Sequence, residues 1–484
     1  MTDTRPLITT FDELFVRHAP RDLFHGDDGR RFLYGDVLRL AQTPEFMGTR
    51  RALVLCLLDN VPGALLGYLA LMSAQAVPMN VAAALPDARL AELLVRYRPE
   101  FVWLPQSRLA EFPGADVRHV LEGHCLVALP ADRGVMPHND LALLLSTSGS
   151  TGSPKFVRLS QRNVLSNAQA IADYLALTPE DRPVTSLPPH YTYGLSVIHS
   201  HLVVGSTIAL TDKSLFDRGF WDFMKSAGVS SFAGVPYHYD MLRKLRFWRQ
   251  DLSALRLLTQ AGGRMAPEVS LEMAQESAAR GIRYVTMYGQ VEATARMAYL
   301  PPELAVAKAG SIGLAIPGGS LHLEDESGAV ITSPDVAGHL VYRGDNVSLG
   351  YAQGREDLAR GDEHQGVLRT GDIAQRDADG CFQIVGRQKR FLKLFGHRVN
   401  LEDIEMDLQR TGFDVACGGQ DDQLKVYVVA ASVADCTAIK AQVVASLKVH
   451  PSAVVVLTLP ALPRSEAGKV QYALLEAQAA EALA

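Results

Sequence analysis

The feature that most constrains this 484-residue chain is the segment LLLSTSGSTGSPK at residues 143–155. A run of leucines, typical of a buried strand, leads directly into a loop of Ser, Thr and Gly that ends at Lys155. Glycines let backbone N–H groups converge on one anion, hydroxyls add donors, and the lysine adds positive charge. The segment therefore predicts a phosphate-binding loop. Its candidate ligands are Thr147, Ser148, Gly149, Ser150, Thr151, Gly152 and Lys155.

This loop differs from the common phosphate loop of nucleoside triphosphatases. The pattern GxxxxGK[ST] requires a Lys-Ser or Lys-Thr pair after its second glycine, and none follows Gly152. A kinase or triphosphatase interpretation is therefore disfavoured. A flexible Ser/Gly linker is the remaining alternative, and it explains poorly why a buried strand runs straight into the loop.

The chain as a whole has the pattern of an α/β protein with several subdomains. Short apolar runs such as ALVLCLL, FVWLP and YVTMYG alternate with helical patterns, which indicates buried strands. Within a large N-terminal domain at 1–388, the Gly-rich stretch at about 310–386 predicts a β-rich, barrel-like part. Residues 389–484 have a compact strand and helix pattern, with helices expected at LEDIEMDLQRT and DCTAIKAQVVASL, and predict a small α+β domain.

Composition and charge exclude several classes of function. The net charge is −6 and the basic residues are scattered, so no nucleic-acid-binding face is expected. The five cysteines have no CxxC pair, and the N-terminus has no apolar signal region, so we expect buried thiols in a cytoplasmic protein. Residues 60–86 are uncharged, but Pro62, Gln75, Pro78 and Asn80 divide them into a buried helix and strand rather than a membrane span.

The segment TSGSTGSPK resembles the phosphate-loop signature of the adenylate-forming superfamily, which comprises acyl-CoA synthetases, luciferases and peptide-synthetase adenylation domains. Further matches follow in the family's order, from about residue 30 to Tyr472. The resemblance implies an enzyme that uses ATP and Mg²⁺ to convert a carboxylic acid into an acyl-adenylate and pyrophosphate. It also implies a mobile C-terminal domain.

The second match consists of QAGGRMAPE and YVTMYGQVEAT. In the family these segments flank the adenine ring and the α-phosphate, and the glutamate corresponding to Glu292 holds Mg²⁺, a role that suits a carboxylate. An alternative role for Glu292 is a charge at a helix N-terminus. Val291 stands where the family usually has threonine, so one hydroxyl donor is missing. The nucleotide-binding candidates are Ala261, Gly262, Gly263, Tyr288 and Gly289.

The last two matches lie towards the C-terminus. In LRTGDIAQRDADGCFQIVGRQKRFLKLFGHRVNLEDIE, the resemblance assigns Asp372 and Arg387 to the ribose. It places the domain hinge at Lys389, and it places Lys393 and Gly396 in the loop that forms the acceptor channel in the second half-reaction. In LPRSEAGKVQYALL, Lys469 corresponds to the catalytic lysine that contacts the carboxylate and the α-phosphate, where an ammonium stabilises developing negative charge.

The pocket for the acid is expected in PPHYTYGLSVIHSHL and SFAGVPYHYDML. No aspartate lies between Pro188 and Leu210 to pair with an α-ammonium group, so a standard α-amino acid is not the expected substrate. Aromatic and small residues favour an apolar or partly apolar small carboxylic acid. We expect His199 and His201 to pack inside a helix rather than to catalyse. The candidate pocket residues are Tyr191, Tyr193, Gly194, Ala233, Gly234 and Val235.

The acceptor of the acyl group is less constrained by the sequence. Coenzyme A is the first choice because most free-standing members of the superfamily use it, while a carrier-protein thiol and an amine remain alternatives. A different class, a nucleotide-binding protein without catalysis, is favoured only by Val291. A phosphotransferase would be distinguished by ADP as its product.

Overall fold

The computed structural model describes residues 8–130, 134–146, 155–387, 390–394, 397–429, 431–447, 449–464, 470–472, 474–475 and 477–478. The chain forms two compact units. The first comprises Met1–Thr147, Pro154–Leu321 and Tyr342–Leu368, and the second comprises Ser148–Ser153, His322–Val341 and Arg369–Ala484. Each unit has its own hydrophobic core.

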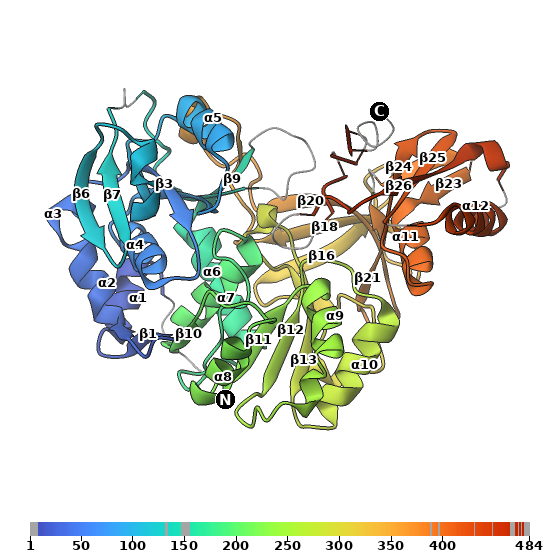
Figure 1. Ribbon diagram of the computed structural model, residues 1–484, viewed down its shortest axis with the longest axis horizontal. Helices are drawn as coiled ribbons and strands as arrows, with labels where there is room; N and C mark the ends of the chain where they lie inside the picture. The colour runs from blue at the N-terminus through green and yellow to red at the C-terminus, as the bar shows by residue number, and fades with distance from the viewer. Residues whose placement is uncertain are drawn as a thin grey trace. The chain divides into compact units, whose positions relative to one another are not determined.

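The first unit is built on an eight-stranded sheet (Figure 1). Its central strands β3, β4, β5 and β8 run parallel, and β3 is buried along its whole length, as expected when both faces of a sheet are covered. The strands in spatial order are β19 (Gly350–Ala352), β9 (Phe156–Ser160), β8 (Leu141–Ser146), β4 (Val77–Ala82), β3 (Leu53–Leu58), β5 (Phe101–Pro105), β7 (His124–Ala128) and β6 (Asp116–Leu121).

The uncharged stretch at residues 60–86 forms the predicted buried helix and strand. Helix α4 (Pro62–Ser73) is apolar on all sides and buried from Gly63 to Ser73, which is the pattern of a helix enclosed by a core. A Cβ on Gly67 would overlap the indole of Trp103, so the helix can approach β5 only with glycine there. No helix in the described part of the chain is long and apolar enough to cross a membrane.

Two smaller sheets complete the strands of the first unit. In one, β11, β12 and β13 run parallel and β14 and β15 are antiparallel. Its members are β11 (Ser231–Gly234), β12 (Leu257–Gln260), β13 (Arg283–Tyr288), β14 (Ala298–Tyr299) and β15 (Leu314–Ala315). The other consists of β10 (Ile208–Leu210), β1 (Asp22–Gly26) and β2 (Arg31–Leu33).

Helices cover these sheets, and α6 and α7 lie side by side in Figure 1. Helix α6 begins directly after β9 because Ser160 and Asn163 form a capping box, with each side chain bonding to the other residue's backbone N–H. The α-helices of this unit are α1 (Phe11–His18), α2 (Tyr34–Ala41), α3 (Pro44–Met47), α4, α5 (Asp87–Tyr97), α6 (Gln161–Tyr174), α7 (Thr192–Leu202), α8 (Arg218–Ser226), α9 (Pro236–Lys244) and α10 (Pro267–Ala278). Short 3-10 turns are η1 (Gln106–Glu111), η2 (Phe247–Arg249), η3 (Val291–Ala293), η4 (Pro302–Leu304) and η5 (Arg355–Ala359).

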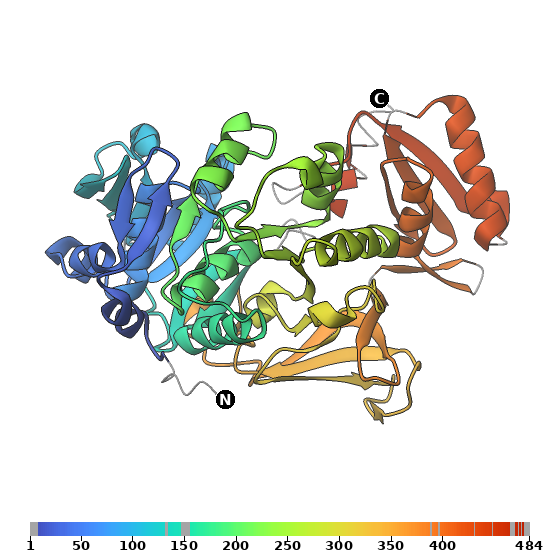
Figure 2. The same cartoon turned by 90° about the horizontal axis from the view of Figure 1, so that it is seen from below.

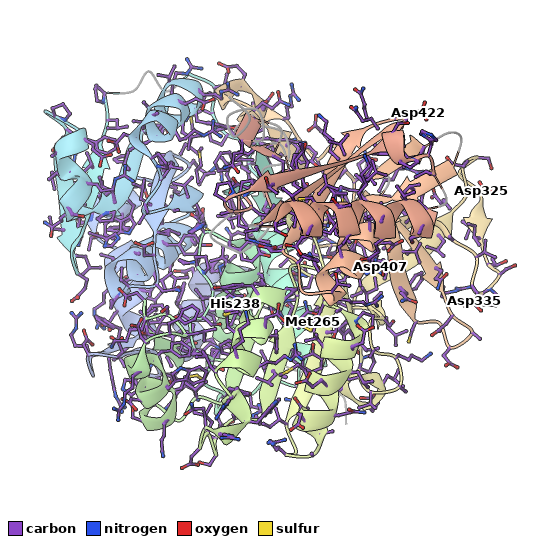
Figure 3. The ribbon with its side chains drawn as sticks, turned by 45° about the vertical axis from the view of Figure 1, so that its right-hand side comes forward. His238, Met265, Asp325, Asp335, Asp407 and Asp422 are labelled. Carbon is purple, nitrogen blue, oxygen red and sulfur yellow. The ribbon has the colours of Figure 1, made fainter. Side chains whose placement is uncertain are left out.

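A five-stranded antiparallel sheet lies mainly in the second unit and corresponds to the β-rich region predicted from sequence. The turns that join its strands carry Asp325 and Asp335, which are labelled in Figure 3. In order, its strands are β17 (Val330–Ile331), β16 (Gly319–Glu324), β18 (Gly338–Gly344), β20 (Val367–Arg376) and β21 (Phe382–Arg387).

The C-terminal part of the second unit is the expected α+β arrangement. Helix α12 (Val433–Leu447) packs on the three-stranded sheet β24-β25-β26, and α11 (Leu401–Arg410) adds to the same core (Figure 2). The remaining elements are β22 (Phe391–Leu394), β23 (His397–Asn400), β24 (Val415–Gln420), β25 (Gln423–Val429), β26 (Val454–Leu459) and η6 (Pro451–Ala453).

Candidate active site

Glu292, the predicted Mg²⁺ ligand, lies in η3, which follows β13 after a short turn. Its side chain is half-buried, and Oε1 accepts a hydrogen bond of 2.9 Å from the Tyr351 hydroxyl. Its backbone carbonyl accepts a 2.9 Å bond from Ser348 N–H. Within the described residues Oε2 makes no hydrogen bond. The carboxylate is therefore held in place at one oxygen and leaves the other for a ligand.

Lys155, from the predicted phosphate loop, lies against the same tyrosine. Its Nζ is 3.1 Å from the centroid of the Tyr351 ring, which is a cation–π contact. Tyr351 is on β19, and this strand pairs antiparallel with β9, so that Tyr351 lies opposite Val157. The fold thus brings an ammonium, a phenol and a carboxylate together from three distant parts of the sequence.

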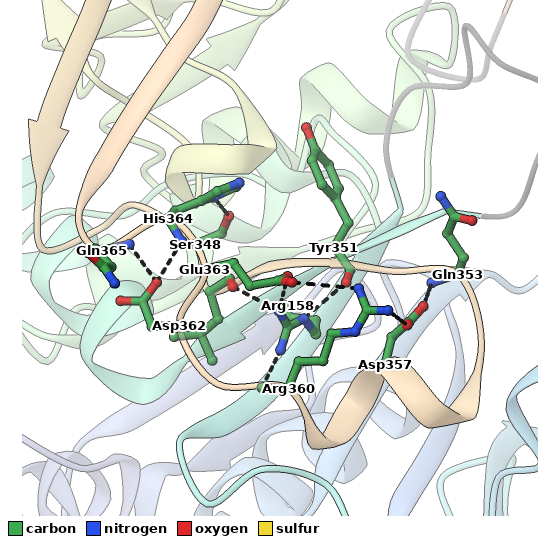
Figure 4. A network of polar contacts seen from close by, with 11 residues as sticks. Arg158, Ser348, Tyr351, Gln353, Asp357, Arg360, Asp362, Glu363, His364 and Gln365 are labelled. Atoms are coloured by element: carbon green, nitrogen blue, oxygen red, sulfur yellow. Dashed lines mark hydrogen bonds and ion pairs between the residues drawn. The ribbon is translucent and has the colours of Figure 1, made fainter.

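A buried arginine fixes the segment that carries Tyr351 (Figure 4). Arg158 on β9 is fully buried, and its Nε donates to the Tyr351 carbonyl at 3.1 Å. Its Nη2 donates to the Leu349 carbonyl at 2.9 Å and to Glu363 Oε2 at 2.5 Å, and Nη1 donates to the Arg360 carbonyl. Desolvation lowers the pKa of Arg158, while Glu363 opposes that effect. The guanidinium therefore holds residues 349–363 against β9.

The electrostatics of Tyr351 favour its role as a donor. Burial raises the pKa of the Tyr351 phenol above its ordinary value, and the neighbouring Glu292 carboxylate raises it further. The hydroxyl consequently keeps its proton and donates a hydrogen bond to the Glu292 carboxylate.

The predicted adenine-binding turn is also well defined. Gln260 Nε2 donates to the Gly263 carbonyl at 3.0 Å across the turn at residues 261–263. Gly262 has φ +85°, and a Cβ there would lie 2.5 Å from the Tyr191 hydroxyl and 2.9 Å from Val235 Cγ1. Two predicted pocket residues therefore contact a predicted nucleotide-binding glycine, and only glycine suits that position.

The other half of the second motif packs closely as well. A Cβ on Gly289 would overlap the Ala295 carbonyl, so the chain folds back tightly after β13. Tyr288 is half-buried, and its hydroxyl accepts a 3.4 Å bond from Gln290 Nε2. Val291, which replaces the family's usual threonine, is 8% exposed and packs into the main core. Apolar packing thus takes the place of the missing hydroxyl.

Among the predicted acid-pocket residues, Tyr193 is buried and its hydroxyl donates to the Thr259 carbonyl at 2.9 Å. A Cβ on Gly194 would overlap the Pro188 carbonyl. Gly234 lies close to His238 of α9, which is labelled in Figure 3. Ala233 lines two small cavities of the first unit.

His199 and His201 are both buried in α7, as the sequence predicted. His199 Nε2 is 3.1 Å from the Tyr68 hydroxyl, and His201 Nδ1 is 2.8 Å from the Val197 carbonyl. Desolvation lowers the pKa of His199 to about 3 and that of His201 to about 4. Both rings are therefore neutral near pH 7.

In the second unit, Asp372 and Arg387 lie directly opposite each other on β20 and β21. Arg387 Nε is 3.1 Å from Asp372 Oδ1 and 3.7 Å from Glu402 Oε1. Asp372 is 2% exposed, whereas the Arg387 side chain is 58% exposed. A hydroxyl-rich ligand would have to compete with this ion pair for the carboxylate.

A second polar cluster in this unit was not predicted from sequence. Arg390 Nη2 is 2.6 Å from Glu405 Oε1, and the Tyr472 hydroxyl donates to Glu405 Oε2 at 3.1 Å. Arg390 also lies over the Tyr472 ring, with Cζ 3.7 Å from the centroid. This cluster ties the segment after residue 389 to the segment after residue 469.

Several predicted site residues lie outside the described residues. These are Thr147, Ser148, Gly149, Ser150, Thr151, Gly152, Lys389, Gly396 and Lys469. Lys393 is placed on β22 by its backbone alone. Sequence reasoning missed Tyr351 and Arg158. The only signal for Arg158 was a charge inside the apolar run FVRLS.

The residues around Glu292 are compatible with a hard cation. Magnesium usually binds one or two protein carboxylates together with phosphates and waters. Glu292 offers one oriented carboxylate of this kind, and the Lys155 ammonium lies against the tyrosine that orients it. The described residues contain no group of three or more acidic, histidine or cysteine side chains that could hold a metal on their own.

The fold is of the α/β class, and the site brings Lys155, Tyr351 and Glu292 together. Residues 33–352 match the sequence pattern of the family described as AMP-binding enzyme, which is about two thirds of the chain. The chain belongs to this family.

Two relatives and one solved structure are similar to this chain. The chain is 32% identical over 280 residues to an indoleacetate–CoA ligase of Aromatoleum aromaticum, covering 57% of this chain and 53% of that protein. It is 29% identical over 367 residues to a sulfoacetate–CoA ligase of Cupriavidus necator, and this match covers 72% of this chain and 70% of that protein. The fold superimposes on o-succinylbenzoate CoA synthetase from Bacillus subtilis in complex with the acyl-adenylate intermediate. The TM-score is 0.77 at 18% identity, covering 97% of this chain and 98% of that one. In the first relative, the match spans about half of that protein's length.

Proposed function

We propose that this protein is an ATP-dependent carboxylic acid ligase that forms an acyl-adenylate and pyrophosphate and then transfers the acyl group to coenzyme A. The observation that carries the proposal is the contact set of Lys155, Tyr351 and Glu292 in a member of the AMP-binding enzyme family. The two relatives named above, both CoA ligases, support the thiol of coenzyme A as the acceptor.

In this reaction a carboxylate attacks the α-phosphate, and both reactants are anionic. Lys155 would balance phosphate charge, and Glu292 would hold Mg²⁺, which neutralises charge on the phosphate oxygens when it is bound. Tyr351 would keep the Glu292 carboxylate oriented. The Ser/Thr/Gly loop at 147–152 and the turn at 261–263 would bind the phosphates and the adenine, and Tyr288 and Gly289 would complete that site.

The C-terminal residues would divide the two half-reactions. Lys469 would stabilise the charge that develops in adenylation, and Asp372 with Arg387 would bind the ribose. A rotation about Lys389 would then withdraw Lys469 and bring Lys393 and Gly396 to the acceptor, as in hinge motions that concentrate rotation in a few residues. This proposal includes a boundary between an N-terminal domain at residues 1–388 and a C-terminal domain at residues 389–484.

The acid would be a small carboxylic acid that is not a standard α-amino acid, bound near Tyr191, Tyr193, Gly194, Ala233, Gly234 and Val235. The names of the relatives do not restrict it further, since indoleacetate has one acidic group and sulfoacetate has two. We also propose a cytoplasmic location, in keeping with the cysteines. All five lie in the described part of the chain, and no disulfide forms there.

Pyrophosphate release from MgATP tests the proposal directly. A panel of aryl, short-chain and medium-chain acids should be assayed alone, with coenzyme A, and with an amine or a carrier-protein thiol. We expect acid-dependent pyrophosphate and AMP, with coenzyme A accelerating turnover. Formation of ADP would indicate a phosphotransferase instead. ATP binding without pyrophosphate from any acid would indicate a binding protein, and acceleration only by an amine or a carrier would reassign the acceptor.

A further inference from the structure

Arg296 is a buried cation that the proposed adenylation chemistry does not use. It lies between η3 and β14 and is 2% exposed. Its backbone carbonyl accepts bonds from Asn167 Nδ2 at 2.8 Å and from Asn346 Nδ2 at 3.1 Å. Asn167 comes before Arg296 in the sequence and Asn346 comes after it, so tertiary contacts fix the backbone at Arg296.

The guanidinium of Arg296 has few partners for a buried charge. Nη1 donates a long 3.5 Å bond to the Tyr174 hydroxyl, and Cζ lies 4.8 Å from the centroid of the Tyr193 ring. Nε is buried without a hydrogen-bond partner. No carboxylate of the described residues forms an ion pair with Arg296. An arginine stays charged in proteins, and a buried charge without an anion is costly, so this arrangement indicates a missing anionic partner.

By comparison, other fully buried arginines of the first unit have such partners. Arg355 is paired with Glu100 at 2.6 Å, and Arg158 is paired with Glu363 at 2.5 Å. Both are structural pairs that join distant segments. Arg296 differs because it faces a cavity instead of a carboxylate.

That cavity is small, with room for about one water molecule. Its lining is partly apolar, and its polar members are Arg296, His201, Ser200, Ser231 and Thr259. Arg296 therefore supplies the positive charge of this lining, and its guanidinium can pair with the oxygens of a carboxylate.

A second cavity adjoins the first and is lined in part by predicted acid-pocket residues. The two share Val197 and Ala233, and the second also includes Gly194 and the apolar side chains of Ile198 and Ile208. Gly194 and Ala233 are predicted acid-pocket residues. The two cavities are thus neighbours with Val197 and Ala233 in both linings, and Arg296 belongs to the lining of the first.

We propose that Arg296 binds a second carboxylate at the far end of the substrate, so that the preferred acid is a dicarboxylic acid with a short apolar spacer. This inference rests on the proposed function, because it specifies the acid of the same reaction. The reacting carboxylate would lie towards Gly194 and Gly262, and the distal carboxylate would lie at Arg296. The space there holds about one water molecule, so Val197 and its neighbours would move to admit the carboxylate and the spacer.

Two assays test this inference. The first measures acid-dependent ATP–pyrophosphate exchange with pairs of monocarboxylic and α,ω-dicarboxylic acids of equal chain length. The second measures thermal protection by the same acids without nucleotide. Both are run on the wild type, Arg296→Met, Arg296→Lys and the control Arg283→Met. Arg283 is a partly buried arginine whose Nη2 also lacks a hydrogen-bond partner, but it lines neither cavity.

We expect the wild type to prefer a dicarboxylic acid by at least about tenfold in kcat/KM, and Arg296→Met to lose about 100-fold on that acid while keeping its monocarboxylic activity. Arg296→Lys should lose less, and Arg283→Met should match the wild type. Equal use of both acids by the wild type, or an equal loss on both in Arg296→Met, would overturn the inference and leave the proposed function intact. Thermal protection by the dicarboxylic acid that depends on Arg296, without any exchange, would instead sustain this site and refute the proposed ligase. If Arg296→Met does not fold, the inference is judged on two results: the preference of the wild type for the dicarboxylic acid, and the loss of that preference in Arg296→Lys.

Discussion

The Tyr351 hydroxyl donates a 2.9 Å hydrogen bond to Glu292 Oε1, across 59 residues of sequence. This bond orients the carboxylate proposed to hold Mg²⁺, and the Lys155 ammonium lies over the face of the same ring. Tyr351 is therefore a positioning residue in the proposed reaction.

Replacing Tyr351 with phenylalanine keeps the ring that contacts Lys155 and removes the bond to Glu292. We expect a fall of about tenfold in the rate of pyrophosphate exchange, corresponding to about 1.4 kcal/mol, together with a higher Mg²⁺ requirement. The control is Tyr97→Phe, which removes a buried hydroxyl that bonds to the neighbouring Ala352 carbonyl at 2.9 Å. Equal exchange rates and equal Mg²⁺ dependence in the two variants would contradict the positioning role.

Arg158 is expected to matter for stability. Arg158→Met leaves the carbonyls of Leu349, Tyr351 and Arg360 without this donor, and we expect a loss of about 3 kcal/mol in the free energy of unfolding. The control Arg162→Met removes an exposed ion pair between Arg162 and Asp345. It should lower the free energy of unfolding by less than about 1 kcal/mol. Urea titration measures both values. Similar losses in the two variants would show that the buried network contributes little.

Stability should fall in mild acid because of the buried histidines. Burial lowers the pKa of His199 to about 3 and those of His201 and His238 to about 4, against about 6.5 in an unfolded chain. As the pH falls below about 6.5, the unfolded state takes up protons that the native state refuses. Each ring therefore contributes stability that is complete above about pH 6.5 and decreases towards its native pKa, by about 1.4 kcal/mol per pH unit.

Urea titrations at a series of pH values check this prediction. His199→Gln should reduce the slope of the unfolding free energy against pH between about pH 6 and pH 4. A slope that is the same in the wild type and His199→Gln would mean that His199 is not the source of the acid sensitivity.

Local patterns in the sequence predicted local structure well. The uncharged stretch at 60–86 gave α4 and β4, and the C-terminal helical patterns gave α11 and α12. The spacing of apolar residues along the sequence indicates the type of an element and its buried face. These elements could therefore be predicted from the sequence. The family resemblance, confirmed by the match over residues 33–352, supplied the functional class.

Contacts between residues far apart in the sequence could not be predicted from local patterns. Arg158 and Glu363 are 205 residues apart, and nothing in either local pattern indicates that the two will meet. Arg296 lies four residues after Glu292, yet only tertiary packing reveals that it is buried without a carboxylate partner. The sequence identifies candidate chemistry, whereas these pairings depend on how the strands are ordered in the sheets.

The two lysines of the C-terminal part should affect different half-reactions. Lys469→Ala should lower acyl-adenylate formation by about 100-fold or more, because it removes a cation proposed to stabilise the transition state. It should still convert a synthetic acyl-adenylate and coenzyme A to the thioester. Lys393→Ala should show the reverse. Single-turnover assays of each step separate these effects, and Lys425→Ala, on β25 of the same unit, is the matched control. Equal loss of both half-reactions in Lys469→Ala would exclude the proposed division of labour and favour one closed arrangement for both steps.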